Sequence, residues 1–160
     1  LDTAAGRALH LARAVGRQGL RSGGHLWLVE RDAAAECRCV IGLPGGGELL
    51  VPADGLELQR AWLLQALALL DPELHRQEFA RIERRASPYR AVSGRTHCAI
   101  VPAAGGFAAR TERTDVVTTL NGAPLQPGVA SQLRDGGLLT LGERGPRVAI
   151  ALMERPRSTP

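Results

Sequence analysis

Closely spaced turn signals near the end of the chain limit its possible folds more than any other feature. An Asn-Gly pair stands at 121–122, and Pro-Gly at 127–128 and Asp-Gly at 135–136 follow at intervals of about eight residues. Asn-Gly favours the tight turn of a β-hairpin, because both of its residues tolerate positive φ angles. Turns repeated at this spacing are typical of an all-β sandwich or barrel. Residues 93–154 are therefore expected to form antiparallel strands.

Short apolar segments between these turns have the composition of strands. Five follow one another in the second half of the chain, at 96–102, 107–111, 116–120, 138–142 and 147–154. Three more precede them, at 25–32, 37–43 and 48–52. Val, Ile, Thr and Leu dominate these segments, and Gly or Pro bounds most of them. The sequence therefore predicts a mainly β protein.

Helical signals interrupt this β pattern. Apolar residues at helical spacing predict an amphipathic helix at 3–20, and the Leu- and Ala-rich segment 56–70 predicts a second helix. A third is expected to begin after Asp71, with Pro72 at its first position and Glu73 in its first turn. Two helices are thus expected between the early and late strands.

Arginine supplies all of the positive charge. The chain has 20 Arg and Lys residues, and each is Arg, for a net charge of +4. On the third helix, Leu74, Phe79 and Ile82 are expected to share an apolar face, with the arginines largely opposite. The densest cluster comprises Arg76, Arg81, Arg84, Arg85 and Arg90. It is interpreted as a solvated face, with a surface for an acidic or phosphorylated partner as the alternative. No basic stripe alternates with aromatic residues, so nucleic-acid binding is not predicted.

Residues for catalysis or metal binding do not form a recognised pattern. The three cysteines cannot all pair within the chain, so a reducing, cytoplasmic compartment is expected. Glu48 stands where a phosphate-binding P-loop has Lys, and no nucleophile-elbow motif is present. The longest apolar run is far short of the ~20 residues of a membrane span. We expect no enzymatic activity, no metal and no cofactor, and no nucleic-acid partner or membrane insertion.

Three motifs in the second half carry a family resemblance. They are Gly-Arg-Thr-His at 94–97, Thr-Leu-Asn-Gly at 119–122, and a Gly-Gly hairpin at 135–142 that ends in Leu-Gly. In this order and spacing, residues 94–154 resemble the second half of a forkhead-associated (FHA) domain. The resemblance implies an antiparallel β-sandwich whose loops at one end bind phosphothreonine peptides.

The first half of the family pattern fits in two places. In the preferred alignment, the opening strands lie before residue 58, Val-Ile-Gly-Leu at 40–43 takes the place of the family's Ile-Gly-Arg, and residues 58–92 form a helical insertion. In the other, Ile-Glu-Arg at 82–84 takes that place and residues 1–75 are a separate module. The first is preferred because two isolated hairpins are marginally stable without a sheet to join.

The resemblance also implies site residues. The phosphopeptide-binding candidates are Arg84, Ser93, Arg95, Thr119 and Asn121, and His97 and Gly122 are expected to support the loops. Several positions at which the family has phosphopeptide-binding side chains hold unsuitable residues here. The arginine position falls on Leu43 in the preferred alignment, the serine position on Gly94 and the threonine position on Leu120. Phosphothreonine recognition is therefore expected to be weak or lost.

The expected fold is an FHA-like antiparallel β-sandwich with an N-terminal helix and a two-helix insertion. Its parts are 1–22 (helix), 23–57 (opening strands), 58–92 (insertion), 93–154 (second half) and 155–160 (frayed tail). The expected function is that of a protein-interaction domain, cut from a larger bacterial signalling or secretion/assembly protein and located in the cytoplasm. The partner is a protein, phosphorylated or not. The alternatives are a structural or oligomerisation module that acts through its helices, and a small ligand-sensing domain.

Overall fold

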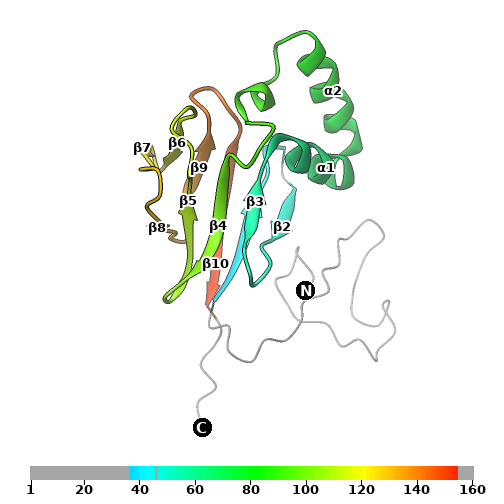
Figure 1. Cartoon of the computed structure of the whole chain (residues 1–160). Coiled ribbons are helices and arrows are strands. Elements are labelled where there is room, and N and C mark those ends of the chain that lie inside the picture. Colours follow the sequence, from blue (N-terminus) through cyan, green and yellow to red (C-terminus); the bar gives the residue numbers. More distant parts are fainter. Residues whose placement is uncertain (1–36, 46, 155–160) are drawn as a thin grey trace, which may run out of the picture. The chain divides into compact units, whose positions relative to one another are not determined.

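The computed structural model describes residues 37–45 and 47–154. The helix expected at 3–20, the strand expected at 25–32 and the tail at 155–160 lie outside the described residues. The described strands form two antiparallel sheets that pack face to face (Figure 1).

The larger sheet has six strands in the order β2-β1-β10-β9-β6-β7. They are β1 (Cys37–Gly42), β2 (Glu48–Leu50), β6 (Thr118–Leu120), β7 (Ala123–Pro124), β9 (Leu138–Leu141) and β10 (Arg147–Glu154). The smaller sheet has four strands in the order β3-β4-β5-β8. They are β3 (Leu56–Leu58), β4 (Cys98–Ala103), β5 (Gly106–Arg110) and β8 (Ser131–Gln132). The predicted fold class is confirmed: an antiparallel sandwich with two helices.

Alternating strand residues of both sheets fill the space between them. Ile41 and Leu139 of the larger sheet and Ile100 of the smaller one are fully buried, and Ile150 is 2% exposed. Such alternation places every second side chain on the inner face of a strand. The core is mainly aliphatic, since the chain has few aromatic residues.

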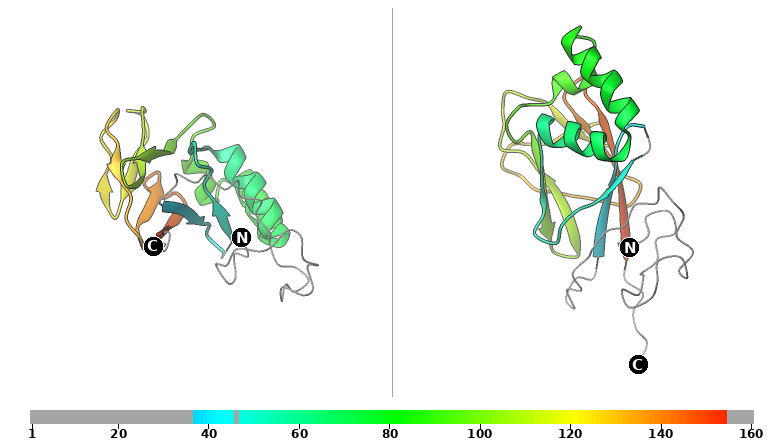
Figure 2. Two further views of the ribbon diagram at one scale, coloured as in Figure 1. Left: turned by 90° about the horizontal axis from the view of Figure 1, so that it is seen from below. Right: turned by 90° about the vertical axis from the view of Figure 1, so that its right-hand side faces the viewer.

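The strand β1 belongs to this sandwich, because all six of its residues pair with β10, from Cys37 opposite Glu154 to Gly42 opposite Ala149. Residues 37–42, which the second alignment assigned to a separate module, are thus hydrogen-bonded within the sandwich. Two helices, α1 (Arg60–Leu70) and α2 (Pro72–Glu83), and a short 3-10 helix, η2 (Pro88–Ala91), lie between β3 and β4. Figure 2 shows the helices and the β7–β8 region on opposite sides of the sandwich.

The helical insertion leaves and re-enters the smaller sheet at neighbouring points. The N–H of Arg60 donates to the carbonyl of Ser93 over 3.0 Å, and the N–H of His97 donates to that of Leu58 over 2.8 Å. The Arg60 guanidinium also donates to the carbonyls of Tyr89 and Val92, at 3.1 and 2.9 Å. These bonds close the base of the insertion and place the segment after η2 at one end of the sandwich.

Helix α2 begins as predicted, with the Asp71 side chain accepting a hydrogen bond from the N–H of Leu74 over 3.0 Å. The predicted apolar face is wrong at one position. Phe79 is 52% exposed, and the neighbouring Glu78 is only 5% exposed. Glu78 is stabilised in this place because its carboxylate accepts hydrogen bonds from Ser87 (2.6 Å) and Arg81 (2.5 Å).

The Leu- and Ala-rich pattern predicted a helix from residue 56, although the family alignment placed 56 and 57 with the opening strands, and the helix begins later. Residues 56–58 form β3 instead, because Leu58 pairs with Cys98 and is fully buried in the sandwich. Tertiary pairing has overridden the helical propensity of this Leu-rich segment. The two-residue strands β7 and β8 were not predicted, since so short a segment has no periodicity to recognise.

Candidate functional site

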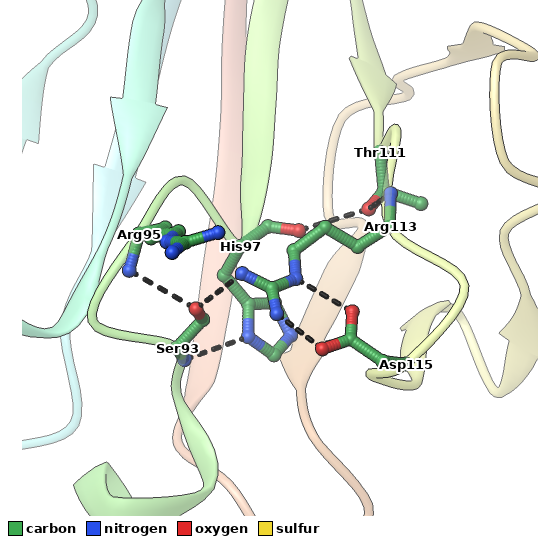
Figure 3. Close-up of polar contacts among 6 residues, drawn as sticks. All are labelled: Ser93, Arg95, His97, Thr111, Arg113 and Asp115. Atoms are coloured by element: carbon green, nitrogen blue, oxygen red, sulfur yellow. Dashed lines mark hydrogen bonds and ion pairs between the residues drawn. The ribbon is translucent and has the colours of Figure 1, made fainter.

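The loop before β4 is folded around the side chains of Ser93 and His97 (Figure 3). The backbone N–H of Ser93 donates to Nδ1 of His97 over 3.1 Å, and the N–H of Arg95 donates to Oγ of Ser93 over 3.0 Å. The loop is thus fixed at both of these residues. The Ser93 hydroxyl lies at its centre.

His97 itself is fully buried, and burial lowers the pKa of its imidazole below the ordinary value. The positive charge of Arg113 lowers this pKa further, while a backbone contact with Val117 and the charge of Asp115 oppose the change. A neutral ring with Nδ1 unprotonated is the form that can accept the Ser93 N–H. His97 therefore supports the loop from within.

A second loop, residues 111–117 between β5 and β6, is tied to the first. The Thr111 hydroxyl donates to the carbonyl of His97 over 2.9 Å and accepts from the N–H of Arg113 over 3.2 Å. The Arg113 guanidinium then donates through Nη1 to Oγ of Ser93 over 2.7 Å. Figure 3 shows the guanidinium lying between the two loops. A hydroxyl and a cation thus meet at one end of the sandwich.

Asp115 accepts hydrogen bonds from the other edge of the Arg113 guanidinium. Nε of Arg113 donates to Oδ1 of Asp115 over 2.8 Å, and Nη2 donates to Oδ2. The side chain of Arg113 is 23% exposed and that of Asp115 is 64% exposed. Hydrogen bonding to Arg113 holds the pKa of Asp115 below its usual range, and the charge of Arg95 acts in the same direction. Asp115 is therefore an ionised group facing two arginines.

The structure brings together three of the residues predicted from the sequence: Ser93, Arg95 and the supporting His97. Arg84 lies at the exposed C-terminal cap of α2, and Thr119 lies in β6 opposite Thr140 and Pro124. Among the described residues, no hydrogen bond or ion pair joins either of these two to Ser93. They are the candidates that the structure does not place in the cluster.

Asn121 and Gly122 form the turn between β6 and β7, with φ angles of 53° and 83°. The Asn121 side chain accepts a hydrogen bond from the N–H of Leu138 over 2.8 Å. The predicted tight turn is present, and its Asn side chain braces β9.

This turn lies away from the Ser93 loop. The end of β6 that lies nearer to Ser93 is the one at Val117. Its carbonyl accepts from the N–H of Gly142 over 2.8 Å, and Gly142 packs closely against Ala91, two residues before Ser93. Asn121 follows Thr118 by three residues, about 10 Å along an extended strand. The loop that does meet Ser93 is the one that carries Arg113.

Arg113 is the residue that sequence reasoning missed. No sequence motif marks this arginine. The topology does indicate its position, because β4 and β5 form an antiparallel hairpin in which Ala99 pairs with Arg110. The residues before β4 and after β5 must therefore meet at one end. Leu43, at the expected arginine position, is 4% exposed and packs in the core.

Residues 37–45 and 47–154 offer neither a metal-binding cluster nor a reactive thiol at Cys98. They contain no group of three or more His, Cys, Asp or Glu residues arranged to hold a metal ion. Cys39 and Cys98 are fully buried, and burial raises the pKa of the Cys98 thiol to about 12. Such a thiol is a poor nucleophile at neutral pH. Within the same residues, every helix is too short or too polar to cross a bilayer.

Similar solved structures identify the fold of this chain. The solution structure of the FHA domain of an Arabidopsis thaliana hypothetical protein matches with a TM-score of 0.50 and 18% identity, over 76% of this chain and 91% of that one. A structure described as an analysis of phosphothreonine-dependent FHA domain interactions matches with a TM-score of 0.48 and 17% identity, over 74% and 99%. No protein-family model and no curated protein matches the sequence. The chain has the FHA-like fold.

Proposed function

We propose that this chain is a non-catalytic protein-interaction domain of the FHA-like fold, with weak or lost recognition of phosphothreonine. It serves in the cytoplasm as part of a larger bacterial signalling or secretion/assembly protein. The observation that supports this most is the contact between Arg113 and Ser93, which joins two loops at one end of the sandwich. A scaffold that fixes polar loop residues by buried hydrogen bonds suits binding to another protein.

Weak phosphate recognition follows from the charges at this end. The expected arginine position holds Leu43, whose side chain is buried, and the position expected to supply a hydroxyl holds Gly94. Arg113 supplies a guanidinium from another position, but Asp115 neutralises it. Each charge-assisted contact to a phosphate contributes about 1.5–3 kcal/mol, so losing several weakens binding by orders of magnitude.

Titration with matched peptide libraries tests this function. One library carries phosphothreonine at a fixed position, and the other carries threonine there. We expect the domain to show no measurable preference for the phosphorylated library. Micromolar binding that disappears on dephosphorylation and in Ser93→Ala would contradict the weakened recognition.

Two exposed apolar side chains favour oligomerisation through the helices as the second candidate. Leu69 of α1 is 78% exposed and Phe79 of α2 is 52% exposed. Large apolar side chains on an exposed surface are typical of interaction sites when they form one patch. Sedimentation equilibrium of the chain and of Leu69→Ser/Phe79→Ser distinguishes the candidates. A concentration-dependent dimer that the double variant abolishes would favour the helices over the loops.

A further inference from the structure

We propose that Asp115 is an internal competitor that keeps the Arg113–Ser93 site closed to phosphorylated side chains. The inference rests on the proposed function and adds to it the reason why phosphate binding is weak. The carboxylate of Asp115 would occupy the part of the site that a phosphate group needs, and a phosphate could displace it.

The first observation is which edge of the Arg113 guanidinium is occupied. Asp115 contacts Nε and Nη2, with both of its carboxylate oxygens engaged. A phosphate bound by arginine uses two parallel N–H groups in the same way. The carboxylate oxygens of Asp115 therefore lie where two phosphate oxygens would bind.

The second observation is the state of the Ser93 hydroxyl. Its oxygen accepts from the N–H of Arg95 and from Nη1 of Arg113, at 3.0 and 2.7 Å. A serine hydroxyl can accept two hydrogen bonds and donate one. Within the described residues no acceptor contacts this O–H, so the hydroxyl remains able to donate to a ligand oxygen beside the guanidinium.

The third observation is that Arg113 has supports other than Asp115. Its N–H is held by the Thr111 hydroxyl, which is itself bonded to the buried His97, and its Nη1 is held by Ser93. Removing the Asp115 charge should leave the guanidinium in place. Asp115, by contrast, is 64% exposed, and exposed ion pairs are weak. Asp115 is therefore held weakly, and removing its negative charge leaves this edge of the guanidinium open to a phosphate dianion.

The test uses Asp115→Asn in the complete chain and a phosphothreonine peptide with uncharged flanking residues, measured by calorimetry and by NMR titration. We expect the affinity to rise by about tenfold, because each close unit-charge contact changes affinity by roughly five- to tenfold. Glu112→Gln is the matched control. Glu112 lies in the same loop, is 65% exposed and pairs with Arg110, so the variant makes the same change in charge. It should gain little.

Two results would overturn the competitor role. One is an Asp115→Asn variant that gains no more than Glu112→Gln. The other is a variant that binds less well, because Asp115 would then position Arg113 for the ligand. Equal melting temperatures of the variant and the parent chain exclude a folding defect as the cause, and Asp115→Ser provides a second replacement. Adding Arg113→Ala to Asp115→Asn should abolish the gain.

Unphosphorylated and aspartate-containing versions of the peptide separate this inference from the proposed function. A gain limited to the phosphorylated peptide supports the competitor role. An equal gain in affinity for all three peptides would support a protein-interaction domain. It would overturn the proposal that Asp115 excludes phosphorylated side chains in particular. Tight phosphopeptide binding by the parent chain contradicts the weak recognition in the proposed function, whatever Asp115→Asn does.

Discussion

The backbone N–H of Ser93 donates a hydrogen bond to Nδ1 of the buried His97 over 3.1 Å. The loop that presents the Ser93 hydroxyl is therefore closed on an imidazole whose Nδ1 carries no proton. Protonation at Nδ1 would place two donors against each other and break this contact. The candidate site and the stability of the loop thus depend on the same ring nitrogen.

A pH dependence of stability follows from this arrangement. Burial lowers the pKa of His97 in the folded chain, while the unfolded chain takes up this proton near pH 6.5. The contribution is present in full above about pH 6.5 and is lost as the pH falls, because the unfolded state then binds more protons. We expect the free energy of unfolding in urea to fall more steeply between pH 7.5 and 5 for the parent chain than for His97→Asn.

His75→Gln is the control for this experiment, since it removes a histidine from α2 and leaves the Ser93 loop unchanged. It should keep the steep pH dependence. The same slope in His97→Asn and in the parent chain would show that His97 is not the group responsible.

The N-cap of α2 provides a second prediction. Asp71→Ala removes the acceptor for the N–H of Leu74, which lies 3.0 Å from Oδ1. The free energy of unfolding should fall by about 1 kcal/mol. Asp71→Ser keeps a capping oxygen and should recover most of this loss. Equal melting temperatures for Asp71→Ala and the parent chain would count against the cap.

The buried carboxylate of Glu78 provides a third. Ser87→Ala removes the 2.6 Å hydrogen bond that Glu78 accepts and leaves Arg81 as its partner. It also removes the oxygen that accepts from the N–H of Tyr89 over 3.2 Å at the start of η2. We expect a loss of about 1.5–3 kcal/mol in the free energy of unfolding, as for a hydrogen bond to a charged group. Glu73→Gln, on the exposed surface of the same helix, removes an ion pair with Arg76 and should cost about 0–1 kcal/mol. Similar losses for both variants would contradict the special role of burial.

Local signals predicted much of this fold. Turn residues at 121–122 and 135–136 and the Asp71 cap act within a few residues of the chain, so the sequence alone displays them. The position of Glu78 depends instead on Ser87, nine residues later, and helical periodicity gave no reason to bury a carboxylate in place of Phe79.

The candidate site was predictable only in part, for a related reason. Ser93 and His97 lie four residues apart and form their bond within one loop. Arg113 reaches Ser93 across a separation of twenty residues, through the β4–β5 hairpin. The family resemblance directed attention to Asn121, but pairing of β6 with β9 carries that residue to the other end of the strand.

The last prediction concerns the Asn121 turn. Its φ of 53° and its side-chain bond to the N–H of Leu138 give Asn121 two separable contributions to stability. Asn121→Gly keeps the backbone conformation and loses only the hydrogen bond, whereas Asn121→Ala loses the bond and must also adopt a left-handed conformation. We therefore expect Asn121→Ala to lower the free energy of unfolding by about 2 kcal/mol, and Asn121→Gly by about half as much. Denaturant unfolding of the two variants measures both contributions. Asn121→Ala with unchanged stability but weaker peptide binding would show instead that this turn contacts the partner, together with the loops that carry Ser93 and Arg113.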